Sequence, residues 1–116
     1  MNGRITRTVA ALPSMCGKDS LMRHHSVFEL FMDMAAEHAE ELGIGGAALM
    51  EQGKFWLTVR TRVVFHRRPA LMSRCEAATW PGRPGRLRCE RYYTLSDGGG
   101  LCAEGKTAAV IRLAKQ

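Results

Sequence analysis

The spacing of hydrophobic residues changes along the chain, and the changes divide it into predicted elements. Residues 4–12 favour a strand, because Ile5 and Val9 stand among threonine and arginine. From Ser26 to about Leu42 the spacing becomes helical, and one face collects Phe28, Phe31, Met32, Ala35, Ala39 and Leu42. We therefore predict a long amphipathic helix in the first half of the chain.

Signals at both ends fix the length of this helix. The segment from Ser26 to Glu29 has the pattern of a capping box, and Gly43 takes the C′ position. Three small residues would let a sheet approach closely: Ala35, Ala36 and Ala39. An acidic stripe follows another face of the helix: Glu29, Asp33, Glu37 and Glu40.

Beyond a short helical piece around residues 47–49, the hydrophobic period changes to two. Four strands are predicted there, over residues 57–65, 72–80, 87–95 and 101–113. We expect Gly105 to form a bulge or bend in the last one. A strand, a long helix and a four-strand antiparallel meander make an α+β arrangement of about five strands around one helix.

Composition and charge narrow the class of protein. The 116 residues are 46% hydrophobic and 24% charged, which suits one domain over residues 1–116. The formal charge of +6 favours acidic partners, such as nucleic acid or an acidic carrier protein. The four cysteines form no C-x-x-C pair, and no apolar run is long enough for a membrane span. We expect a cytoplasmic protein with reduced thiols, no metal, no cofactor and no membrane partner.

Five local patterns follow one another between Ser26 and about Val110: residues 31–43, 55–59, 68–69, 78–81 and 91–99. In this order they resemble a single unit of the hot-dog fold thioesterases that act on acyl carrier protein. The resemblance implies a long central helix wrapped by a curved antiparallel sheet, with an acyl slot between them. It also implies hydrolysis of fatty acyl thioesters of acyl carrier protein or coenzyme A. Those enzymes look like two fused units, so one unit implies a homodimer or a dimer of dimers.

Thioester hydrolysis needs a polarised carbonyl and an attacking water or carboxylate. The start of the predicted helix offers free amides as oxyanion donors, from Ser26 through Val27 to Phe28. Asp33 is the first candidate acid, because His24 and Asp33 have the spacing of a hot-dog pattern that places a His before the helix. The alternative role for Asp33 is a solvated position in the acidic stripe.

Other residues are candidates with a plainer alternative beside each. Asp19 is the second candidate acid, or an ordinary turn residue. His24 and His25 would orient the substrate, or are loop residues. The acyl slot, or simply the core, is assigned to five residues: Phe28, Phe31, Met32, Trp56 and Phe65. Phosphates or an acidic carrier surface would be met by basic residues that include Arg67 and Arg68.

Two other functions stay open. The same fold would serve a protein that binds acyl thioesters without hydrolysing them, because the common Asp-x-x-Gly-His loop of hot-dog enzymes is not present. The basic charge would also suit a nucleic-acid-binding module. The sequence has no RNP, zinc-finger or helix-turn-helix pattern, so we expect no nucleic-acid partner and favour the acyl thioester hydrolase.

Overall fold

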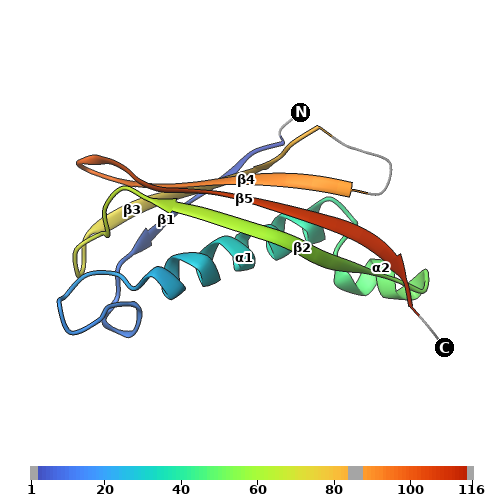
Figure 1. The fold of residues 1–116 in the computed structure, drawn as a ribbon, viewed down its shortest axis with the longest axis horizontal. Helices are drawn as coiled ribbons and strands as arrows, with labels where there is room; N and C mark the ends of the chain where they lie inside the picture. The colour runs from blue at the N-terminus through green and yellow to red at the C-terminus, as the bar shows by residue number, and fades with distance from the viewer. Residues whose placement is uncertain (1–2, 84–87, 115–116) are drawn as a thin grey trace.

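The computed structural model describes residues 3–83 and 88–114, and one long helix lies against one face of its sheet (Figure 1). The elements in chain order are β1 (Ile5–Ala10), the short 3-10 helix η1 (Pro13–Met15), α1 (His24–Glu41), α2 (Gly46–Glu51), β2 (Lys54–Phe65), β3 (Arg74–Pro81), β4 (Arg88–Asp97) and β5 (Gly100–Leu113). The predicted α+β architecture, with a central helix and a five-strand antiparallel sheet, is confirmed. Leu87, the predicted start of the third meander strand, lies outside the described residues.

The strand order in the sheet is β1-β3-β4-β5-β2, and every neighbouring pair is antiparallel. Strands β3, β4 and β5 form a meander. Strand β2 pairs with β5 and not with β3, so the predicted four-strand meander is wrong at its first strand. Alternation shows which face of a strand is buried, but it carries no information about which strand lies beside it.

Strand β2 contains a bulge at Val59, where the pairing with β5 skips one residue. One inserted residue moves the inward positions from even to odd numbers. Trp56 therefore faces α1 before the bulge, and Phe65 faces the core after it. The predicted continuous buried face over residues 57–65 is wrong in its first half, where Leu57 and Val59 are exposed.

Helix α1 begins three residues earlier than predicted. Arg23 is the N-cap, and its carbonyl oxygen accepts hydrogen bonds from the amides of Ser26 at 3.0 Å and Val27 at 3.3 Å. Ser26 lies inside the first turn and is buried, so the predicted capping box does not form. The side chain of Glu29 pairs with His25 instead. Backbone hydrogen bonds in the preceding loop hold the extended entry to the helix and override the capping signal.

The C-terminus of α1 matches the prediction. Gly43 has a φ of 77°, and its amide bonds the carbonyl of Glu40 at 3.1 Å. The amide of Ile44 bonds the carbonyl of Ala39 at 3.0 Å, which completes a Schellman motif. Glycine is favoured at this C′ position because the left-handed conformation is strained for residues with a Cβ. No helix among the described residues is long and apolar enough to cross a membrane.

The buried face of α1 is rotated from the predicted one. The residues it buries are Ser26, Val27, Leu30, Phe31, Met34 and His38. Of the predicted face, Phe31 is fully buried while Leu42 is 49% exposed. The pattern counts His38 as polar, and it therefore misses a position that the fold buries almost completely.

Phe31 packs at the centre of the core. Its ring stacks on Tyr93 with 5.0 Å between centroids. A Cβ on Gly105 would lie 3.2 Å from two carbons of the Phe31 ring. Gly105 pairs in register with Val63 and with Tyr93, so the predicted bulge is wrong. Glycine is needed there because the helix side chain approaches the strand backbone closely.

Candidate functional site

An apolar cavity of about 350 Å³ lies between the C-terminal half of α1 and the sheet. This volume is at the lower end of the range for small-molecule sites, about 300–1,000 Å³. The helix side is formed mainly by Met32, Ala35, Ala36 and Ala39. The sheet side includes Trp56 and Thr58 from β2, Arg91 and Tyr93 from β4, and Thr107 and Ala109 from β5. The alanines therefore border an open space. We had expected them to let the sheet approach the helix closely, and they do not.

Two residues predicted for an acyl slot, Met32 and Trp56, line this cavity. The Trp56 indole N–H donates to the carbonyl oxygen of Ile44 at 2.9 Å, which fixes the ring at the β2 side of the cavity. Phe31, also predicted for the slot, belongs to the core beside it, and Phe28 is half-buried. The bulge in β2 explains why Trp56 faces α1.

Three charged residues border the cavity: Glu40 from α1, and Glu90 and Arg91 from β4. Nη1 of Arg91 donates to Nδ1 of His38 at 2.9 Å and to Oγ1 of Thr79 at 3.2 Å. No carboxylate in the described part of the chain forms an ion pair with Arg91. Sequence analysis missed Arg91 as a site residue. Its position midway between Cys89 and Tyr93, on the inward face of a strand with period two, was the available signal.

Burial shifts the pKa values of both His38 and Arg91. It lowers the pKa of His38, and the positive charge of Arg91 lowers it further. Burial also lowers the pKa of Arg91. A neutral His38 has one ring nitrogen free to accept, which matches the hydrogen bond from Arg91. Burial raises the pKa of Tyr93, whose hydroxyl lies 2.9 Å from Oγ1 of Thr107.

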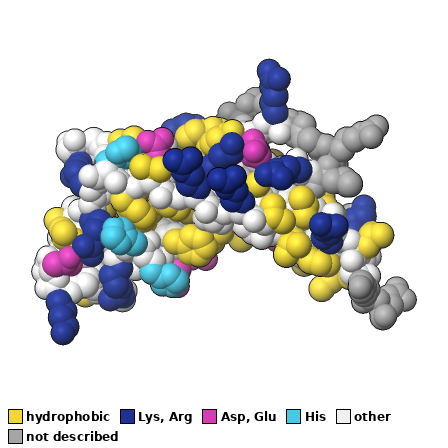
Figure 2. Space-filling model, in the orientation of Figure 1, with side chains coloured by type: hydrophobic (Ala, Val, Ile, Leu, Met, Phe, Trp, Pro, Cys, Tyr) yellow, Lys and Arg dark blue, Asp and Glu magenta, His cyan; other side chains and the backbone are white. Residues whose placement is uncertain are grey.

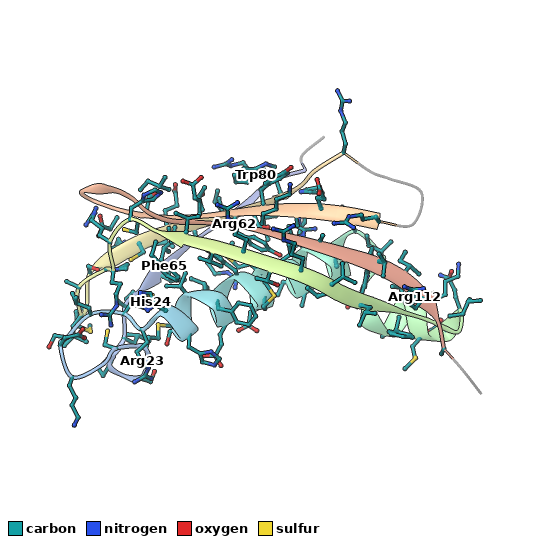
Figure 3. All side chains as sticks on the ribbon, viewed as in Figure 1. Arg23, His24, Arg62, Phe65, Trp80 and Arg112 are labelled. Carbon is teal, nitrogen blue, oxygen red and sulfur yellow. The ribbon has the colours of Figure 1, made fainter. Side chains whose placement is uncertain are left out.

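None of the candidate catalytic residues lines the cavity. Asp19 precedes α1, His24 and His25 form its first turn, and Asp33 lies at its middle. The His24 ring meets the edge of Phe65 with 4.3 Å between centroids (Figure 3). Nε2 of His25 lies 3.2 Å from a carboxylate oxygen of Glu29. The amides of Ser26 and Val27 are bonded to the carbonyl of the N-cap residue. The amides that the helix leaves free are therefore those of His24 and His25.

The two candidate acids differ in their surroundings. Asp33 is exposed on α1, and no described cation pairs with it. Asp19 pairs with Arg68 at 2.7 Å and accepts the amide of Leu21 at 3.1 Å. The hydrogen bond from Arg68, with that from the Leu21 amide, lowers the pKa of Asp19 and makes it a weaker base. These contacts match the turn role that was the alternative for Asp19.

Arg67 and Arg68, predicted to bind substrate, both hold loops together. Arg67 forms a two-point ion pair with Asp97 and also reaches the carbonyl oxygen of Gly100. Arg68 donates from Nε to the carbonyl oxygen of Met22 at 2.8 Å. Other basic side chains surround a shallow groove on the sheet: Arg60, Arg62, Arg88 and Lys106. Figure 2 shows basic side chains gathered over this part of the sheet. No cluster of His, Cys, Asp or Glu within residues 3–83 and 88–114 is arranged to hold a metal ion.

Residues 10–111 match the family model for the acyl-ACP thioesterase N-terminal domain. The chain belongs to this family. The match covers the cavity, the start of α1 and all of the strands except most of β1 and the end of β5. No curated protein shows significant sequence similarity to the chain.

Solved structures share the fold of this acyl-ACP thioesterase N-terminal domain. An acyl-ACP thioesterase from Bacteroides thetaiotaomicron aligns with a TM-score of 0.89 and 18% identity, over 98% of this chain and 50% of that one. The 12:0-ACP thioesterase from Umbellularia californica aligns with a TM-score of 0.85 and 20% identity, over 100% of this chain and 50% of that one. A DHNA-CoA thioesterase from Staphylococcus aureus aligns with a TM-score of 0.83 and 18% identity, over 97% of this chain and 76% of that one. The chain thus spans about half the length of the two acyl-ACP enzymes.

Acidification is expected to destabilise this thioesterase domain through His38. The pKa of His38 is lower in the folded than in the unfolded chain, so the unfolded chain binds a proton at higher pH. The contribution of neutral His38 to the free energy of unfolding is complete above about pH 6.5, the ordinary pKa of histidine. It is lost as the pH falls toward the pKa of His38 in the folded chain. Urea unfolding at about pH 7 and about pH 5 measures the difference.

Two variants isolate this effect. His38→Asn offers an oxygen acceptor to Arg91 and cannot titrate, so its stability should fall less between the two pH values. His66→Asn, at an exposed position, should behave like the natural protein. Asp19 and Asp97 have lowered pKa values, so their contributions change only in more acidic solution. An equal loss of stability in His38→Asn would contradict the assignment.

Arg68→Ala is expected to lower the free energy of unfolding by about 1–2 kcal/mol. The variant leaves the carbonyl oxygen of Met22 without its side-chain donor and releases the loop around Asp19. The half-exposed ion pair itself contributes little. Arg74→Ala, at an exposed position on β3, is the control and should change stability by less than about 0.5 kcal/mol. Urea unfolding of both variants gives the comparison, and equal losses would show that the contacts of Arg68 do not stabilise the loop before α1.

Proposed function

We propose that this chain is an acyl thioester hydrolase that holds the acyl group in the cavity between α1 and the sheet. The cavity carries the proposal, since it is apolar, of ligand size, and lies within the segment that matches the thioesterase family. The substrates are thioesters of acyl carrier protein or coenzyme A. The names of the structural relatives, which act on acyl-ACP and acyl-CoA thioesters, support this choice.

The proposed chemistry uses the start and the middle of α1. The free amides of His24 and His25, at the positive end of the helix dipole, polarise the thioester carbonyl. Asp33 lies nine residues, or about 13 Å, further along the helix than His24, so the Asp33 that takes a proton from the attacking water belongs to a second copy of the chain. The tetrahedral intermediate then expels the thiolate, which takes the proton from Asp33, and the acid product leaves. Asp33 is favoured over Asp19 because Asp19 is held by Arg68.

The separation between Asp33 and the cavity supports a site completed by a second hot-dog unit, here a second copy of the chain. Strand β2 offers an interface, because one edge of this 12-residue strand has no neighbour in the described sheet. Its exposed apolar side chains include Phe55, Leu57 and Val59. Analytical ultracentrifugation should find a dimer or a dimer of dimers, and Val59→Lys should give monomers. If the natural protein is monomeric at high concentration, the proposal that a second copy completes the site is refuted.

Thiol release tests the function itself. The protein is incubated with acyl-coenzyme A and acyl-ACP thioesters of graded chain length, and free thiol is detected with a chromogenic disulfide. Release above the uncatalysed background is expected for at least one member of the series. A folded protein with no release from any of them would overturn the hydrolase.

Acyl binding without hydrolysis is the second candidate. One observation favours it, namely that none of the four candidate catalytic residues borders the cavity. Under this alternative, acyl-coenzyme A binds tightly and is recovered intact. Hydrolysis that is lost in an Asp33 variant would exclude it.

A further inference from the structure

The cavity is lined mainly by apolar residues, and Arg91 is the one cation among its described lining residues. Two carboxylates also border it, those of the exposed Glu40 and of Glu90, which pairs with Lys106 at 3.4 Å. Arg91 comes from β4, and its guanidinium reaches across to His38 of α1. Its two hydrogen bonds, to His38 and Thr79, both come from Nη1. No hydrogen bond is formed by Nε or Nη2 to any described residue. Half of the guanidinium is therefore anchored and half is free.

The anchored half holds the group in place without cancelling its charge. His38 accepts as a neutral imidazole, and Thr79 is a hydroxyl that donates its own hydrogen to the carbonyl oxygen of Tyr92 at 2.9 Å. Neither partner carries negative charge. An arginine guanidinium stays protonated in proteins, so the cavity wall has a fixed positive charge at Arg91, although Glu40 and Glu90 also border the cavity without pairing with Arg91.

The free half of the guanidinium is open to whatever fills the cavity. Every buried side-chain nitrogen and oxygen of the described residues has a hydrogen-bond partner, so the unbonded nitrogens of Arg91 are accessible. A plain alkyl chain would displace water from these donors and offer no hydrogen bond in its place. An oxygen acceptor would replace the water, and a carboxylate would also neutralise the charge with a two-point hydrogen bond.

We propose that the cavity selects acyl groups that carry an oxygen acceptor away from the thioester, a carboxylate above all, and that Arg91 is the specificity-determining residue. The proposal rests on the proposed function, since it assigns the acyl group to this cavity. Arg91 is a binding residue and takes no part in bond cleavage. His38 and Thr79 are positioning residues that aim its free nitrogens into the cavity.

Binding of inert analogues tests this selectivity without relying on hydrolysis. The probes are pantetheine amides, in which nitrogen replaces the thioester sulfur, carrying acyl chains of six, eight and ten carbons. Each chain is compared with its ω-carboxy and 3-hydroxy counterparts by isothermal titration calorimetry. We expect the ω-carboxy form of at least one length to bind about tenfold or more tightly than the plain form. The 3-hydroxy series shows whether a neutral acceptor suffices.

Three variants assign the preference to Arg91. Arg91→Met keeps the length of the side chain without its donors and should reduce the preference to less than twofold. Arg91→Lys keeps the charge and should retain part of it. Arg112→Met, at an exposed position on β5, is the matched control and should keep it all. If Arg91→Met does not fold, the preference of the natural protein for oxygenated analogues, compared with that of Arg91→Lys, still tests the proposal.

Several results would overturn the inference: equal affinity for plain and oxygenated analogues, a preference that survives in Arg91→Met, or no binding of any analogue. Failure of the proposed function is separate from these. Oxygenated analogues bound selectively, with no thioester hydrolysed, would remove the hydrolase and keep the selectivity. Hydrolysis of thioesters, with no preference for oxygenated analogues, would keep the hydrolase and remove the selectivity.

Discussion

Phe31→Ala is expected to lower the free energy of unfolding by about 3–5 kcal/mol, the largest effect on stability predicted for this chain. The Phe31 side chain is fully buried and stacks on Tyr93. Its ring also covers Gly105, where the strand has no side chain of its own to fill the space. Removing the ring leaves a hole that this region cannot close. Urea unfolding, followed by circular dichroism, measures the loss.

Met50→Ala is the control for Phe31→Ala. Met50 is 63% exposed on α2, so truncating it should change stability by less than about 0.5 kcal/mol. A loss below about 1 kcal/mol for Phe31→Ala would mean that Phe31 is not the centre of the core.

Asp33→Asn is expected to reduce turnover of acyl thioesters by about 10²–10⁴-fold, the contribution typical of a general base. Asparagine keeps the shape of the side chain and cannot accept the proton. Asp33 is exposed on α1, so the variant should fold with nearly unchanged stability. Initial rates of thiol release, measured together with urea unfolding, separate loss of catalysis from loss of structure.

Two other variants complete this test. Asp19→Asn weakens the pair with Arg68 and should lower stability slightly while turnover persists. Glu29→Gln, on the same acidic stripe as Asp33, should leave turnover unchanged. Turnover lost in Asp19→Asn and kept in Asp33→Asn would assign the base to the loop before α1.

The types of the elements could be predicted from the sequence because they depend on local physics. Apolar spacing identifies α1, and Gly43 ends it because glycine suits the left-handed C′ conformation. The start of α1 depends on backbone hydrogen bonds from segments distant in sequence, so a local capping pattern misplaced it. The position of β2 beside β5 likewise depends on tertiary packing.

The cavity arises from features that have no individual signature. The bulge at Val59 turns Trp56 toward α1, and the alanines opposite are too small to fill the space. Met32 and Trp56 could be predicted as lining residues because large apolar side chains belong to a slot or a core. Arg91 and His38 were missed because sequence patterns treat polar residues as surface, and only the period-two position of Arg91 between Cys89 and Tyr93 indicated that it faces inward.

Occupation of the cavity by an acyl group is tested most directly through Trp56. In Trp80→Phe, Trp56 is the only tryptophan of the chain, and it lines the cavity. Titration with decanoyl-coenzyme A should shift its emission in a saturable manner. Ala39→Leu, which fills the cavity in the same background, should weaken or abolish the shift. Unchanged emission at concentrations where calorimetry shows the ligand bound would place the acyl group elsewhere and contradict the assignment of this cavity.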